Sequence, residues 1–165
     1  MKLETTRFGT LYLPLDAVIQ FPAGLIGFPR ETEFVLLPHG ESVSIGWLQS
    51  AKTPGFSLPV VSAHGIGEHF PDVPLAELSQ AAGLGKEVEE VAVMAVLCAL
   101  KGQPATVNLM APVVVNSTTR VGAQLVLEGS RYTTRELFVL RPAPGRSSPI
   151  DRAQRSDDTS PARIA

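Results

Sequence analysis

TVNLMAPVVVNSTTRVGAQ, residues 106–124, predicts two β segments separated by a sharp break. Thr106–Leu109 and Val113–Val115 carry β-branched residues, which suit a pleated, half-buried surface. Pro112 cannot donate a hydrogen bond to a neighbouring strand, so it marks a strand start or a bulge. A polar turn at 116–119 then leads into another strand that begins at Arg120.

Three amide side chains, those of Asn108, Asn116 and Gln124, stand among the apolar residues of this stretch. They lie at or near the predicted strand ends, and the stretch contains no Asp, Glu, His or Cys. It therefore suggests a surface that recognises another chain rather than one that performs acid–base chemistry. Buried amides that hold strand ends are an equally open interpretation.

Short predicted strands continue on both sides of this stretch, bounded by Gly, Pro and other turn residues. They are a hairpin formed by Leu3–Thr6 and Gly9–Leu13, then Val18–Phe21, Phe34–Leu37, Ile45–Gln49, Phe56–Val61, Val91–Leu100, Arg120–Leu127 and Arg135–Leu140. One convincing helix is expected near 74–82, between a capping Asp72 and Gly83. The segment 63–69 is expected to be a loop. This pattern predicts a mostly β fold, a small antiparallel β-barrel or barrel-like sandwich with one short helix.

Length and composition predict one domain over residues 1–140, followed by a disordered tail over 141–165 that is rich in Pro, Ser, Arg and Asp. Residues 1–140 carry 9 Lys and Arg against 13 Asp and Glu, a formal charge of −4, while the tail carries 5 Arg against 3 Asp, or +2. An acidic domain argues against direct nucleic-acid or membrane binding. A single cysteine and an N-terminus without an apolar core predict a cytoplasmic protein.

Residues that could support catalysis are scarce. His64 and His69 lack the spacing of a metal-binding motif, and no serine stands in a nucleophile elbow. Cys98 follows an apolar run, which predicts packing in the core. We therefore expect no catalytic residues, no metal and no cofactor. Trp47, at the end of a predicted strand, is expected either to pack in the core or to anchor an interface.

Several motifs occur in a fixed order along the chain. They are FPAGLIGF at 21–28, WLQS at 47–50, TVNLMAPVVVN at 106–116, RVGAQ at 120–124 and YTTR at 132–135. The ordered set resembles the bacterial flagellar assembly factor FliW family over roughly residues 3–140. The family usually has acidic residues after WLQS, whereas this chain continues with Ala51 and Lys52.

The resemblance implies a small barrel-like protein without catalytic activity that binds two protein partners. One is CsrA, a dimeric RNA-binding regulator whose repression of flagellin translation it relieves, and the other is flagellin itself. Secretion of flagellin would free the factor to sequester CsrA, which matches synthesis to export. We expect partner contacts at Trp47, Gln49, Asn108, Asn116, Arg120 and Gln124. The alternative is a β-barrel that binds a small apolar ligand, for which an open apolar interior would be required.

Overall fold

The computed structural model describes residues 1–74, 76, 80, 83–84 and 90–139, and every structural statement below concerns these residues. Their elements, in chain order, are β1 (Lys2–Thr5), β2 (Gly9–Tyr12), η1 (Leu15–Ala17), β3 (Val18–Gln20), β4 (Glu33–Pro38), β5 (Ile45–Ser50), β6 (Ser57–Ser62), α1 (Ala63–Ile66), η2 (Gly67–His69), β7 (Val91–Cys98), β8 (Thr106–Val107), β9 (Val113–Asn116), β10 (Val121–Gln124) and β11 (Glu136–Leu137). Each strand overlaps one expected from the sequence, and none of the described helices is long and apolar enough to cross a membrane.

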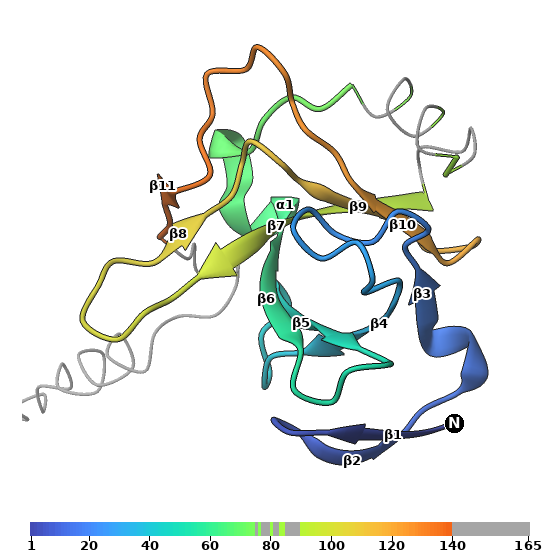
Figure 1. The fold of residues 1–165 in the computed structure, drawn as a ribbon. Helices are drawn as coiled ribbons and strands as arrows, with labels where there is room; N and C mark the ends of the chain where they lie inside the picture. Colours follow the sequence, from blue (N-terminus) through green and yellow to red (C-terminus); the bar gives the residue numbers. More distant parts are fainter. Residues whose placement is uncertain (75, 77–79, 81–82, 85–89, 140–165) are drawn as a thin grey trace, which may run out of the picture.

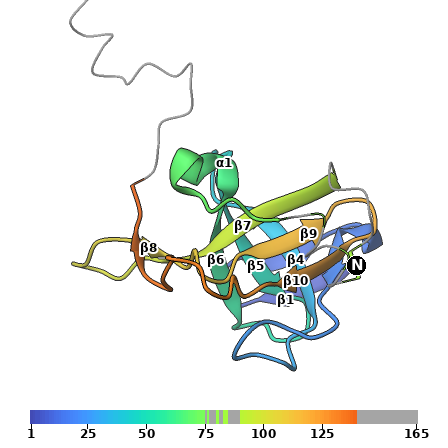
Figure 2. The same cartoon turned by 90° about the horizontal axis from the view of Figure 1, so that it is seen from above.

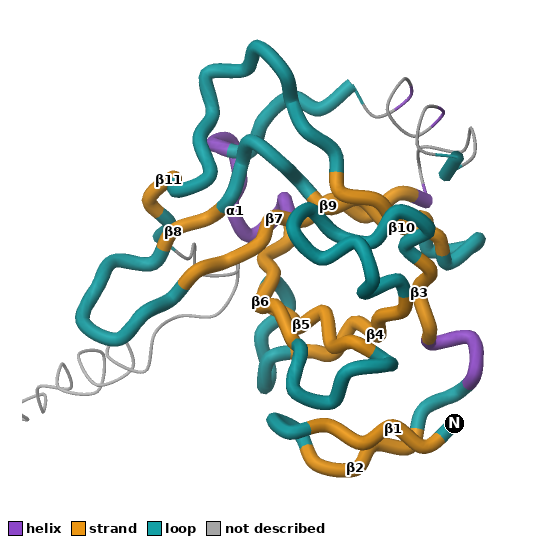
Figure 3. The backbone as a smooth tube through the Cα atoms, in the orientation of Figure 1, coloured by secondary structure: helices purple, strands orange, loops and turns teal. Residues whose placement is uncertain are grey.

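Seven of the described strands close into a barrel (Figures 1 and 3). The sheet runs in the order β11-β8-β7-β6-β5-β4-β3-β10-β9, and a further pairing of β7 with β9 joins the ring. Every pairing around the ring is antiparallel except that of β10 with β3, which is parallel and has one register pair, Val121 with Gln20. The predicted barrel is thus confirmed, with one short parallel seam where β3 and β10, which are distant in the sequence, lie side by side.

Strand β7 has buried residues on both of its faces because its middle part lies between two apolar clusters. Met94 faces the barrel interior, whereas its neighbours Ala95 and Leu97 face a second apolar cluster. That cluster is covered by α1 and by the segments around β8 and β11, which extend the sheet beyond the barrel (Figure 2). A strand that is covered on both faces has no polar side, which explains the nearly continuous apolar run at 91–98.

Cys98 departs from its expected place in the core. It is exposed, because it lies at the end of β7 that has left the barrel and pairs only with Thr106 of β8. The alternation of the strand turns Leu97 toward the apolar cluster and Cys98 away from it. An apolar run therefore predicted the strand correctly, but not where its covered part ends.

A helix that the sequence did not predict follows β6. Ser62 caps α1 by accepting a hydrogen bond from the amide of Gly65 (3.2 Å), and η2 continues it to His69. The expectation of a loop at 63–69 was wrong, because a helix of one turn is too short to show a helical period. The helix expected near 74–82 lies mostly outside the described residues.

The hairpin β1–β2 forms a separate two-stranded sheet beside the barrel, next to β4 and β5 (Figure 1). Leu3 and Thr5 of β1 are buried. The amide of Thr6 donates to the carbonyl of Pro54 (2.9 Å). Thr5 also fixes the turn, since its hydroxyl accepts from the amide of Phe8 and donates to the carbonyl of Gly9 (both 2.8 Å). The hairpin is therefore held at a defined place on the outer wall.

The parallel seam closes through an unusually close approach of an aromatic ring to the backbone. Phe21, which follows β3 and is fully buried, lies against Gly122 of β10. A Cβ atom at position 122 would come within 2.5 to 2.9 Å of three ring carbons of Phe21. Only glycine leaves room for the ring there, so the seam depends on this residue pair.

We expect Gly122→Ala to destabilise the protein by about 1–3 kcal/mol, because the fully buried Phe21 ring would have to shift within the packed core. Urea denaturation followed by circular dichroism measures the change. Gly55→Ala is the matched control, since its added Cβ would meet one atom at an ordinary 3.6 Å. Equal losses of stability in the two variants would contradict the close approach at the seam.

Candidate functional site

The outer face of β5 carries two of the expected contact residues, Trp47 and Gln49, which point the same way because they are two positions apart. Gln49 is fully buried. Its Nε2 donates to the carbonyls of Ser50 (3.0 Å) and Phe56 (3.1 Å), with longer contacts to those of Thr53 and Pro54. Its Oε1 is buried without a hydrogen-bond partner. The side chain thus holds the 50–56 loop together from inside, as a structural residue would.

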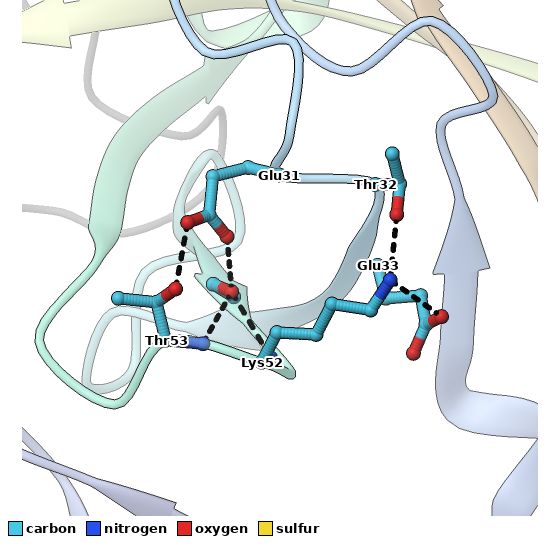
Figure 4. Close-up of polar contacts among 6 residues, drawn as sticks. Glu31, Thr32, Glu33, Lys52 and Thr53 are labelled. Atoms are coloured by element: carbon cyan, nitrogen blue, oxygen red, sulfur yellow. Dashed lines mark hydrogen bonds and ion pairs between the residues drawn. The ribbon is translucent and has the colours of Figure 1, made fainter.

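A polar network fixes the other side of this loop (Figure 4). Glu31 accepts hydrogen bonds on both carboxylate oxygens, from the hydroxyls of Ser50 and Thr53 (both 2.6 Å). Lys52 donates to the hydroxyl of Thr32 (2.9 Å) and pairs with Glu33 (3.1 Å). Lys52 is therefore tied to Thr32 and to Glu33 at the start of β4.

Trp47 belongs to a group of four side chains on the outer wall, which we call the Trp47 cluster: Arg7, Phe8, His39 and Trp47. The guanidinium carbon of Arg7 lies 4.2 Å from the centroid of the Trp47 ring, and Phe8 meets the same ring edge-on at 5.8 Å. The indole Nε1 of Trp47 donates to Nδ1 of His39 (3.1 Å). Trp47 is half-buried, while Arg7 and His39 are exposed. Of the two readings of Trp47, this arrangement favours a residue on the surface.

Asn108 and Asn116 hold turns. The Oδ1 of Asn108 accepts from the amide of Ala111 (3.0 Å), which closes the bend before Pro112. Asn116 is almost fully buried, and its Oδ1 accepts from the amides of Thr118 and Thr119 (2.9 and 2.8 Å). Its Nδ2 donates to the carbonyl of Leu84 (2.9 Å). Both amides satisfy backbone groups that would otherwise lack partners at the ends of strands.

Arg120 and Gln124 connect β10 to the N-terminal part of the chain. The guanidinium of Arg120 donates from Nε to the carbonyl of Asp16 (2.7 Å) and from a terminal nitrogen to that of Ala17 (2.9 Å). Its own carbonyl accepts from the amide of Gln20 (2.8 Å). Gln124 donates to the carbonyl of Ala111 and accepts from the amide of Ile26 (both 3.0 Å). These contacts fasten the two sides of the parallel seam.

The six residues expected to contact partners therefore do not form one patch. Trp47 and Gln49 share the outer face of β5, and Asn116, Arg120 and Gln124 surround the seam. Sequence reasoning missed Arg7, Phe8 and His39, which the structure brings to Trp47 from a hairpin turn and the β4–β5 turn. No local sequence motif predicts this cluster, because it forms only when the β1–β2 hairpin packs against β5.

The barrel interior is filled. Its core consists of nine buried side chains, with three further apolar residues packed against them. The nine are Ile19, Phe21, Leu25, Phe34, Leu48, Val60, Met94, Val113 and Val115. A pocket of about 300 Å³ lies at one end, beside the β4–β5 turn, and Leu36, Val43 and Met94 are among its lining residues. Val60 and Met94 of the core also line this pocket, so the ligand-binding alternative, which required an open interior, is restricted to this end of the barrel, and the other core side chains are packed together.

The described residues hold no group of three His, Cys, Asp or Glu placed to bind a metal ion. Their polar side chains in the motif segments are instead engaged with backbone groups. The fold and these contacts define a class: a small closed β-barrel, fastened at one parallel seam, with a cation–aromatic cluster on its outer wall.

Comparison with known proteins places this barrel in a family. The family model described as FliW protein matches residues 2–138. The flagellar assembly factor FliW of Heliobacterium modesticaldum is 36% identical over 139 residues, which cover 82% of this chain and 88% of that protein. That of Geotalea uraniireducens is 32% identical over 160 residues, 97% of each. A crystal structure of the flagellar assembly factor FliW superposes with a TM-score of 0.73 at 25% identity, covering 83% of this chain and 96% of that one. The chain belongs to the FliW family of flagellar assembly factors.

We expect Arg120→Ala to lower the free energy of unfolding by about 1–2 kcal/mol, because two charge-assisted hydrogen bonds across the seam are lost. Arg120 has a positive φ of 56°, a conformation that costs a non-glycine residue about 1 kcal/mol. Arg120→Gly should therefore be more stable than Arg120→Ala, although it lacks the same guanidinium. Urea denaturation of the three proteins measures both differences. Wild-type stability in the alanine variant would show that Arg120 does not fasten the seam.

Proposed function

We propose that this protein is a non-enzymatic regulator in the cytoplasm that couples flagellin synthesis to flagellum assembly by binding two protein partners in turn. The first partner is the translational regulator CsrA, whose repression of flagellin translation it relieves, and the second is flagellin. The observation that carries the proposal is membership of the FliW family across residues 2–138, with the matching barrel. The FliW of Geotalea uraniireducens aligns with 97% of this chain, so the similarity extends over nearly the whole domain.

The mechanism needs only competition between two binding equilibria. While flagellin is retained, it occupies the protein, and CsrA remains free to repress translation. When flagellin is exported, the protein is released and sequesters CsrA, so translation resumes. Since each partner shifts the population available to the other by mass action, no chemical step is required.

The charge of the domain supports a basic partner. Residues 1–140 have a formal charge of −4, and such a body attracts a positively charged RNA-binding protein and accelerates its encounter. Of the six expected contact residues, we keep Trp47 as a contact and assign Gln49, Asn108, Asn116, Arg120 and Gln124 to holding the fold. The half-buried ring of Trp47 is the type of side chain that dominates interface energies.

Isothermal calorimetry tests this function with three titrations of the purified full chain. We expect heat of binding with CsrA, heat of binding with flagellin, and loss of the CsrA signal when flagellin is present in saturating amount. Absence of binding to either partner would overturn the proposed function. Binding of both partners at once with unchanged affinities would overturn the exchange mechanism while leaving the two interactions in place.

A further inference from the structure

The Trp47 cluster contains an arginine, Arg7, whose side chain lies over an aromatic ring and makes no hydrogen bond to the described residues. The guanidinium of Arg7 lies over the Trp47 ring at 4.2 Å, and the side chain is exposed. The ion pairs among the described residues are Lys2 with Glu4 and Lys52 with Glu33, and neither includes Arg7. An arginine stacked on an aromatic ring keeps its planar edge free for a carboxylate.

The hairpin that carries Arg7 offers no spare acid to it. Glu4 is the one acidic residue within positions 1–12, and it is engaged by Lys2 (2.6 Å) and by the hydroxyl of Thr10 (2.8 Å). These two hydrogen bonds, that of Lys2 first, lower the pKa of Glu4 and keep it as a paired carboxylate. The donors of Arg7 are therefore left for a group from outside the hairpin.

His39 adds a second donor beside the first. Its Nδ1 accepts the indole hydrogen of Trp47 (3.1 Å), so a neutral ring must carry its own hydrogen on Nε2. The ring is exposed and its centroid lies 6.0 Å from that of Trp47. Arg7, over the Trp47 ring, and His39, at its Nε1, thus both present N–H groups beside this indole, where they can donate to an incoming carboxylate.

The position of Arg7 is fixed before any partner arrives. Thr5 ties the turn on both sides of it, and Thr6 fastens the turn to the 50–56 loop through Pro54. Phe8 packs edge-on against Trp47, which anchors the next residue as well. Since the turn that carries Arg7 and the ring beneath its guanidinium are already ordered, less ordering is needed when Arg7 pairs with a carboxylate.

We propose that the Trp47 cluster is a docking site for an Asp or Glu side chain of a protein partner, held by Arg7 and His39. This assignment rests on the function proposed above. Of the two partners named there, we assign the site to flagellin rather than to CsrA. The acidic body attracts the basic regulator, whereas an unpaired cationic spot on that body suits an acidic segment instead.

The test measures flagellin and CsrA affinities of the full chain for wild type, Arg7→Ala, Arg7→Lys and Arg30→Ala. Arg30 is the matched control, because it is also exposed and forms no ion pair among the described residues. We expect Arg7→Ala to weaken flagellin binding about tenfold to hundredfold, with Arg7→Lys in between, and Arg30→Ala to have little effect. CsrA binding should be unchanged by all three substitutions.

Trp47 supplies an independent readout, as it is the only tryptophan of the chain. Flagellin should protect its fluorescence from iodide quenching in the wild type, and less so in Arg7→Ala. Unchanged flagellin affinity in Arg7→Ala would overturn the docking site, and a loss of CsrA affinity instead would overturn the choice of flagellin. If the wild type binds neither partner, the proposed function fails and this assignment fails with it. Circular dichroism melting confirms that each variant is folded.

Discussion

Closure of the barrel at the β3–β10 seam is the constraint on which the rest of the structure depends. The seam has one register pair, so backbone hydrogen bonds alone contribute little to it. Two side-chain contacts add to the stability of the seam. The Phe21 ring packs against Gly122, and the guanidinium of Arg120 donates to the carbonyls of Asp16 and Ala17. Both sides of the seam come from segments about a hundred residues apart, so the N-terminal and C-terminal parts of the domain stabilise each other.

This constraint explains why the segment 106–124 carries polar residues that the fold itself requires, which supports our proposal that the contact surface lies elsewhere. The side chain of Asn116 bonds backbone groups of the 116–119 turn and the buried carbonyl of Leu84. The side chain of Arg120 bonds backbone carbonyls on the other side of the seam. The fold therefore requires an amide at position 116 and a guanidinium at position 120 to make these hydrogen bonds. Our proposal therefore assigns recognition to side chains of the Trp47 cluster such as that of Arg7, which lies over the Trp47 ring and forms no ion pair among the described residues.

Much of the fold could be predicted from the sequence, because each strand is marked by the residues within it and by the turn residues next to it. The β-branched runs and turn residues predicted the hairpin, the long β7 and the strands around Pro112, and the ordered motifs predicted the family. The parallel seam could not be predicted, since it is a contact between distant segments with one register pair. The exposure of Cys98 and the grouping of Arg7 with Trp47 depend in the same way on how the elements pack, and no periodicity encodes that.

Native-state hydrogen exchange at Gln20 tests the role of the seam most directly, because its amide donates the seam's hydrogen bond to Arg120 (2.8 Å). If the seam holds the barrel closed, this amide opens only with the whole domain, and its exchange free energy should equal that of the buried amides in β4 and β5. Exchange of Gln20 through a local opening, while the amides of β4 and β5 remain protected, would contradict the account.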